Sequence, residues 1–171
     1  MKKIIPALFC LVFLSKTHAQ SPNDNLKKLG IQLNTPAAPI ANYVKFVQVG
    51  KLIYLSGHGP LLANGNYLTG KLGKDISIEQ GYEAAKLCGV ALLSTLQMAI
   101  GDLSKVNRIV KATGFVNSTE NFTDQPKVIN GFSDLMVAVF EEKGRHARSA
   151  VGTASLPLNM AVEIEMIVEI K

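Results

Sequence analysis

The stretch Arg-His-Ala-Arg-Ser-Ala-Val-Gly-Thr-Ala-Ser-Leu-Pro, residues 145–157, decides the fold that the rest of the sequence predicts. Its residues 147–154 are typical of a strand, which ends at the turn Leu156-Pro157. A second strand, 161–170, follows at once. In this strand Val162, Ile164, Met166, Val168 and Ile170 alternate with Glu163, Glu165, Ile167 and Glu169. The alternation predicts a sheet with one face on helices and the other face partly polar.

Two charged side chains stand out in these strands. Arg148 lies among small residues that leave room for a ligand, and its guanidinium is a planar fork of donors that suits a carboxylate. Glu163 lies early in the second strand, where we expect it to face the same space and to move protons. The alternative interpretation is an ordinary cross-strand surface pair, because most charged residues are simply solvated.

The remaining segments supply the other elements of one α+β domain. Alternating residues at 43–49 and 51–56 flank the tight turn Val49-Gly50-Lys51 and predict a β-hairpin. Apolar periodicity then predicts helices at 78–100 and 124–143, with a strand at 106–117 between them. The order β-β-α-β-α-β-β predicts a single mixed sheet with both helices packed on one face. Apolar residues on the uncovered face, such as Ile167, favour its burial against other subunits.

Local signals predict three of the boundaries. Ser77 and Gln80 form a capping box at the start of the first helix. The run Ser56-Gly57-His58-Gly59-Pro60 is expected to stop the second hairpin strand and to let backbone approach a ligand closely. Gly144 is the expected C-cap of the second helix.

Length and composition bound the class of protein. A chain of 171 residues favours one domain with a real core, and 47% apolar with 18% charged residues is ordinary globular composition. The formal charge is +5, but Lys2, Lys3 and Lys16 lie in the first nineteen residues, which hold no acid. Without them 15 basic residues stand against 13 acidic ones, a net charge of +2. This is too little to indicate nucleic acid or an anionic membrane as a partner.

Residues 1–19 are typical of a signal peptide. Lys2-Lys3 precede the apolar run Ile4–Leu14, and a polar segment ends at Ala19, which makes Gln20 the expected mature start. The run is shorter than the roughly 20 apolar residues that span a bilayer. We therefore expect an exported protein, periplasmic or secreted, that leaves the membrane after processing. A retained N-terminal anchor is the alternative.

The mature chain divides into a lead-in and a domain. Residues 20–40 predict an extended lead-in with a short helical turn at 25–30, and residues 41–171 form the domain. Cys88 is the one cysteine of the mature chain, and its place on an apolar helical face indicates packing rather than a nucleophile. The sequence shows no Walker loop and no metal-ligand spacing, so we expect no metal site.

Several short motifs together resemble one family. Ala147-Arg148-Ser149, Leu156-Pro157 and Val162-Glu163-Ile164-Glu165 are similar to the C-terminal signature of the RidA family (reactive intermediate deaminase, also YjgF-like or endoribonuclease L-PSP-like). Upstream, Asn42-Tyr43-Val44, Gly50 and Leu55-Ser56-Gly57 fit the family's opening hairpin in the same order. The resemblance covers about residues 41–171, and the segment 121–131 resembles a longer variant subgroup.

The resemblance implies the chorismate mutase-like fold, assembled as a homotrimer with ligand clefts between adjacent subunits. It implies that Arg148 binds the carboxylate of a 2-imino or 2-enamino acid. Glu163 would help a water molecule attack the imine, which releases ammonia and a 2-keto acid. No metal or organic cofactor is implied. The substrate pocket would be lined by Tyr43, Ser56, Gly57 and Ala150.

Three departures from the family pattern affect this expectation. Ala150 and Gly152 stand where the best-known deaminases carry a cysteine and a glutamate, and His58 replaces a usual glutamine. These changes alter the pocket wall, so a different substrate or a loss of activity is a possible consequence. One rival function is a non-catalytic trimer that binds small carboxylates. A weaker rival is an endoribonuclease, for which a basic face or a histidine pair would be expected.

Overall fold

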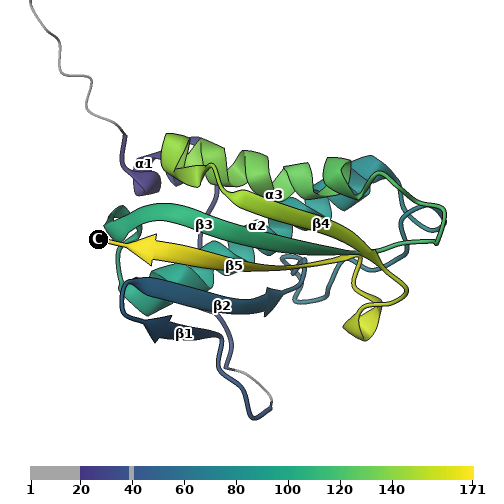
Figure 1. Cartoon of the computed structure of the whole chain (residues 1–171), viewed down its shortest axis with the longest axis horizontal. Coiled ribbons are helices and arrows are strands. Elements are labelled where there is room, and N and C mark those ends of the chain that lie inside the picture. The colour runs from purple at the N-terminus through teal and green to yellow at the C-terminus, as the bar shows by residue number, and fades with distance from the viewer. Residues whose placement is uncertain (1–19, 39–40) are drawn as a thin grey trace, which may run out of the picture.

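The computed structural model describes residues 20–38 and 41–171, so the predicted signal peptide at 1–19 lies outside the described residues. The described chain forms a five-stranded mixed sheet with helices on one face (Figure 1). The helices are α1 (Pro22–Lys28), α2 (Ile78–Ile100) and α3 (Gln125–Phe140). The strands are β1 (Phe46–Val49), β2 (Leu52–His58), β3 (Val106–Asn117), β4 (Ala147–Thr153) and β5 (Val162–Ile170). The predicted α+β class and element order are confirmed.

The strand order in the sheet is β1-β2-β5-β3-β4. Strands β3 and β4 run parallel, because α3 connects them as a crossover, and the other neighbouring pairs are antiparallel. Figure 1 shows β4 at one edge beside α3 and β1 at the opposite edge. Strand β5 therefore lies at the centre, and β3 separates it from β4.

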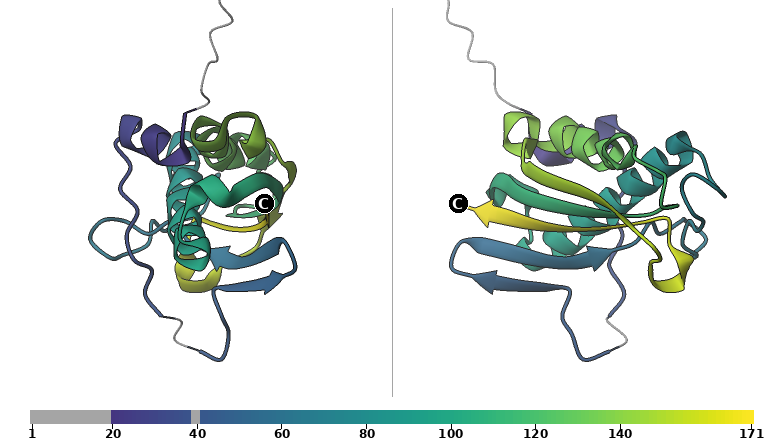
Figure 2. Two further views of the ribbon diagram at one scale, coloured as in Figure 1. Left: turned by 90° about the vertical axis from the view of Figure 1, so that its left-hand side faces the viewer. Right: turned by 45° about the vertical axis from the view of Figure 1, so that its right-hand side comes forward.

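The core lies between the sheet and the two long helices, which cover the same face (Figure 2). The alternation predicted for the last strand is confirmed: Val162, Ile164, Met166 and Val168 are at most 1% exposed. The apolar face of α3 packs into the same core. Its buried residues are Val128, Ile129, Gly131, Phe132, Leu135, Met136, Val139 and Phe140. Burial of so many aliphatic side chains is the main stabilising force of the fold.

Helix α2 is the central helix of this core. It is long and apolar enough to cross a membrane by length and composition alone, yet Ala84, Leu92 and Leu96 have no exposed surface. Cys88 is fully buried, and its thiol donates a weak hydrogen bond of 3.6 Å to the Val162 carbonyl. Burial raises the pKa of Cys88 well above its ordinary value. The prediction that Cys88 is a packing residue is confirmed.

Of the three boundaries predicted from local signals, the capping box of Ser77 and Gln80 at the start of α2 is confirmed and the other two were wrong. Strand β2 runs through Gly57 to His58 instead of stopping at Ser56, because its pairing with β5 resumes after an irregularity. Helix α3 ends at Phe140, and Glu141 adopts a left-handed φ of 55° before a 3₁₀ turn. Gly144 closes that turn and is not the cap of α3. A Cβ there would lie 2.2 Å from the Met136 carbonyl oxygen, so close approach is the reason for glycine.

The start of the lead-in is helical rather than extended. The predicted helical turn at 25–30 is instead helix α1, which begins at Pro22. Ser21 caps it by accepting a hydrogen bond from the Asp24 N–H. Pro22 has no backbone N–H, so it leaves no unsatisfied donor in the first turn. Leu26 and Asn25 are buried, and the Asn25 amide donates to the Val139 carbonyl of α3 at 3.0 Å. Helix α1 is thus fixed to the end of α3.

Candidate functional site

Arg148 lies on the helix-covered side of the edge strand β4. It pairs in register with Ala112 of β3, which is fully buried beneath the helices. Paired residues of neighbouring strands share a face of the sheet. The Nη1 atom of Arg148 accordingly reaches α3, where it donates to Asn130 Oδ1 at 2.9 Å and to Ser133 Oγ at 3.0 Å. Helix α3 therefore holds one side of the guanidinium.

His146 extends this contact. Its Nδ1 lies 2.6 Å from the Gly144 carbonyl oxygen, and its Nε2 lies 3.2 Å from Ser133 Oγ. Its ring also packs edge-on against the Phe132 ring, with centroids 5.4 Å apart. Burial lowers the pKa of His146; the hydrogen bond to Gly144 raises it, and the charge of Arg148 lowers it further. The imidazole is thus neutral at physiological pH.

Glu163 lies on the opposite face of the sheet. It pairs with Phe115 of β3, three residues along from Ala112, so the two side chains point to opposite sides. The Glu163 carboxylate lies directly over Gly57 of β2: a Cβ on Gly57 would fall 2.0 Å from Oε1. Burial, with a smaller effect from Glu165, raises the pKa of Glu163. A carboxyl whose pKa is raised is a stronger base than a free carboxyl, which suits it to accept a proton from water.

Other predicted pocket residues gather near Glu163. The Ser56 hydroxyl donates to the Val44 carbonyl at 2.7 Å, and the Ser56 N–H donates to the Lys45 carbonyl at 2.9 Å. These bonds hold the segment that contains Tyr43 beside Ser56 and Gly57. Tyr43 itself is 56% exposed.

Ala150, in contrast, lies near Arg148 on β4 and not near Glu163. It pairs with the buried Gly114 and packs against the core from the edge strand. Ala150 and Arg148 are two residues apart on β4 and share its helix-covered side. The predicted pocket residues are therefore divided between two places in the chain.

We call Glu163, Ser56 and Gly57 the acid half-site, and Arg148, Asn130, Ser133 and His146 the arginine half-site. Strand β3 lies between β4 and β5, and the two half-sites face opposite sides of the sheet. The structure thus rules out a cross-strand pair of Arg148 and Glu163 within one chain. It also does not bring them to the single space that the sequence predicted.

His58 has a structural position. Its Nδ1 lies 2.7 Å from the Ser56 carbonyl oxygen and its Nε2 lies 2.7 Å from Oγ1 of Thr95, a fully buried residue of α2. Burial lowers its pKa, with opposing effects from Ser56 and Lys45. Its side chain is thus directed at α2.

Asn130, Ser133 and His146 were not predicted as site residues. Two signals in the sequence point to them. His146 is two residues before Arg148, so in an extended segment both face the same side. Asn130 and Ser133 are three residues apart on a helix, which makes them neighbours on its surface.

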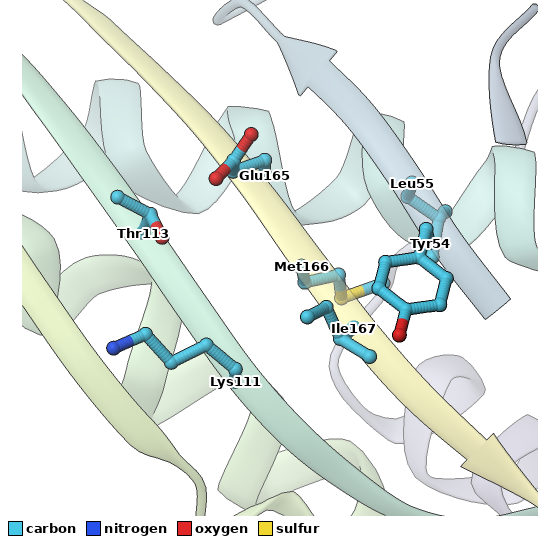
Figure 3. Close-up of a pocket in the computed structure, with 7 residues that line it drawn as sticks. All are labelled: Tyr54, Leu55, Lys111, Thr113, Glu165, Met166 and Ile167. Carbon is cyan, nitrogen blue, oxygen red and sulfur yellow. The ribbon is translucent and has the colours of Figure 1, made fainter. Parts of the chain in front are cut away.

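The uncovered face of the sheet carries a shallow hollow (Figure 3). Tyr54 lies over Ile167 in this view, and Glu165, Thr113 and Lys111 lie along β5 and β3. Tyr54 is 42% exposed, and Val47 and Val49 of β1 are 51% and 61% exposed. Lys111 Nζ donates to Ser149 Oγ at 3.0 Å, so this lysine is attached to β4. The uncovered face is therefore mainly apolar on β1 and β2 and mainly polar along β3 and β5.

Comparison with known proteins identifies the family. Residues 23–170 match the family described as "YjgF/chorismate_mutase-like, putative endoribonuclease". The chain is 47% identical to protein TCP17 of Trypanosoma cruzi over 147 residues, which cover 85% of this chain and 92% of that protein. It is 33% identical over 142 residues to the 2-iminobutanoate/2-iminopropanoate deaminase of Dermatophagoides farinae, covering 81% and 95% of the two chains.

A solved structure agrees with these sequence matches. The crystal structure of the protein Atu1372 from Agrobacterium tumefaciens superposes with a TM-score of 0.81 at 45% identity, covering 88% of this chain and 94% of that chain. The family match covers both half-sites and all five strands. The chain therefore belongs to the YjgF family with the chorismate mutase-like fold, a family that includes 2-iminobutanoate/2-iminopropanoate deaminases.

Proposed function

We propose that this protein is a deaminase that hydrolyses 2-imino or 2-enamino acids to 2-keto acids and ammonia. The observation that carries the proposal is the state of Glu163, a carboxyl whose pKa is raised by burial and which lies over Gly57. A carboxyl with a raised pKa is suited to act as a general base toward water and then as a general acid. Arg148 supplies the second requirement, a guanidinium whose side-chain hydrogen bonds to α3 both come from Nη1 among the described residues. Relatives at 33% identity carry the name of this activity.

The chemistry needs little from the protein beyond placement. Arg148 binds the substrate carboxylate, and an enamino acid first tautomerises to the imine. Glu163 accepts a proton from water as the water oxygen bonds to the imine carbon, giving a carbinolamine. That proton passes from Glu163 to nitrogen. Glu163 then transfers the carbinolamine hydroxyl proton to nitrogen as the C–N bond breaks, so ammonia leaves and the C=O bond of the keto acid forms. An imine carbon is already electrophilic, so holding one water and one carboxylate accounts for most of the effect.

Because the half-sites lie on opposite faces, we propose that the active site forms between two copies in a homotrimer. The open face supports this assembly, since Val47, Val49 and Tyr54 leave apolar surface exposed on it. Light scattering of the mature protein should give three times the subunit mass. Tyr54→Lys should lower that mass, whereas Leu158→Lys should not, because the 74% exposed Leu158 lies in the loop before β5. A monomeric wild type would remove the proposed cleft.

Activity is tested with imines generated in place by an amino-acid oxidase, with keto-acid release as the readout. Wild type should exceed the buffer rate, and Glu163→Gln should abolish the excess. Binding of pyruvate without any rate above buffer would show a carboxylate-binding module instead. Cleavage of RNA with no deamination would favour the endoribonuclease. Of the described histidines, His58 contacts Thr95 of α2 and His146 contacts Ser133 of α3, and both nitrogens of each ring already have a partner in the chain.

We further propose that the protein is exported through residues 1–19. The support is the sequence pattern of Lys2-Lys3, the apolar run Ile4–Leu14 and Ala19. N-terminal sequencing of exported material should begin near Gln20. Intact Met1 on cytoplasmic protein would contradict the proposal.

A further inference from the structure

The hydrogen bonds around Ser133 have one possible direction. A carbonyl oxygen only accepts, so the Gly144 oxygen 2.6 Å from His146 Nδ1 places the proton of the neutral ring on Nδ1. Nε2 then has a lone pair and accepts the Ser133 hydroxyl hydrogen at 3.2 Å. The Ser133 oxygen in turn accepts from Arg148 Nη1 at 3.0 Å. The chain of donors therefore runs from Arg148 through Ser133 to His146 and ends on Gly144.

The same contacts orient the guanidinium. Nη1 carries two hydrogens, and Asn130 Oδ1 and Ser133 Oγ accept both. Within the described ranges 20–38 and 41–171, all side-chain hydrogen bonds of Arg148 come from Nη1. Nε and Nη2 remain, and these two donors form the edge of the fork that binds a carboxylate in bidentate geometry.

We propose that Asn130, Ser133 and His146 form an anchor relay that positions Arg148 for a small carboxylate ligand, and that protonation of His146 disconnects the relay. The proposal rests on the proposed role of Arg148 as the carboxylate anchor. Ser133 and His146 act through Arg148 and are positioning residues. When Nε2 gains a proton, the Ser133 hydrogen loses its acceptor, and two cations then face one hydroxyl oxygen.

The surroundings of His146 favour the neutral state and identify the groups that act on it. Helix α3 contributes Ser133 and the Phe132 ring, neither of which is charged, and the 3₁₀ turn contributes the Gly144 carbonyl. The nearby Arg145 is paired with Glu142 at 2.9 Å. Arg148 is the charge that lowers the pKa of His146, after burial. Since the pKa lies below its ordinary value of 6.5, the disconnection should occur as pH falls below 6.5.

The test measures pyruvate affinity of the mature protein by calorimetry between pH 8 and pH 5. For wild type we expect affinity to fall below pH 6.5. Ser133→Ala should weaken binding by about 2- to 10-fold at pH 8, the range for one lost hydrogen bond. Ser133→Thr keeps the hydroxyl and should restore affinity. His146→Gln keeps an acceptor but does not titrate, so it should bind at pH 8 and flatten the pH profile, whereas His146→Phe should bind weakly throughout.

Ser94→Ala is the matched control, because the Ser94 hydroxyl donates to the Val90 carbonyl of its own helix. It should leave affinity and pH profile unchanged. Binding without turnover would remove the deaminase but leave the relay in place. Arg148-dependent binding that Ser133→Ala and His146→Phe do not change would overturn the relay alone. A wild type that binds no pyruvate would overturn both proposals.

Discussion

The acid half-site and the arginine half-site are held by different forces. Glu163 is placed by packing: it is partly buried on the central strand, over a glycine that leaves space for its carboxylate. Arg148 is placed by directed hydrogen bonds from the edge strand to α3. Burial makes the charged form of Glu163 costly, whereas the Arg148 guanidinium keeps donors for a ligand. This difference fits the proposed roles of Glu163 in proton transfer and of Arg148 in carboxylate recognition.

The largest effect should come from Glu163→Gln. The amide fits the same space but accepts no proton, so kcat for keto-acid release should fall about 10²- to 10⁴-fold. Pyruvate binding should change little, because the carboxylate anchor lies on the other half-site. If Glu163→Gln instead loses pyruvate binding and retains kcat, Glu163 serves recognition and the proposed division of roles is wrong.

Gly57→Ala keeps the Glu163 carboxylate but should displace it, so this variant tests whether the position of the carboxylate matters for activity. The new Cβ would lie 2.0 Å from Glu163 Oε1, the end of a flexible side chain that can move aside. Stability should therefore change little, while kcat should fall by roughly 10²-fold, as expected for a displaced catalytic group.

The matched control is Gly131→Ala, where the Cβ would lie 2.0 Å from the Tyr82 backbone oxygen of α2. Backbone cannot move aside cheaply, so this variant should lose stability by thermal denaturation. Full activity of Gly57→Ala would show that the carboxylate position over Gly57 is not needed.

Arg148→Ala should weaken pyruvate binding by about 10- to 150-fold, the loss expected for a charge-assisted pair. Arg148→Lys keeps the charge but not the bidentate fork, so it should recover only part of the affinity. Arg145→Lys is the control, since Arg145 forms an exposed pair with Glu142. Equal affinity of Arg148→Lys and wild type would show that charge alone suffices.

The sequence predicted the elements and the identity of both charged residues, but not their relation in space. Period-two alternation fixes which residues of β5 are buried, so Glu163 was placed on the open face of its strand. The alternative interpretation, a cross-strand pair of Arg148 and Glu163, would require β4 and β5 to be neighbours. A strand-helix-strand segment instead pairs its two strands in parallel, and β3-α3-β4 follows that rule. Arg148 therefore lies at an edge, with β3 between it and Glu163.

The contacts of Arg148 were beyond prediction for a different reason. Apolar periodicity shows which side of α3 is buried, but it does not define the exact rotation of the helix about its axis. A hydrogen bond between Ser133 and Arg148 requires a precision of less than 1 Å in the docking of α3 against β4. The close turn at Gly144, which brings His146 back to α3, also depends on that docking.

The smallest effect concerns the pH dependence of folding stability. The contributions of Glu163 and His146 to that stability should change with pH in opposite directions. The folded-state pKa of Glu163 is raised above 4.5, so its contribution to stability is present below pH 4.5 and is lost as pH rises through the folded pKa. Glu163→Gln should therefore be slightly more stable than wild type at pH 7, with no advantage at pH 4.

The folded-state pKa of His146 is lowered, so its contribution to stability is present above pH 6.5 and is lost as pH falls below it. His146→Gln should thus gain relative stability in acid. Both groups are partly solvated, so shifts in Tm on the order of 1–3 °C are expected from thermal unfolding across pH 4–8. Shifts of the same sign for both variants would show that the two half-sites are not held by different forces.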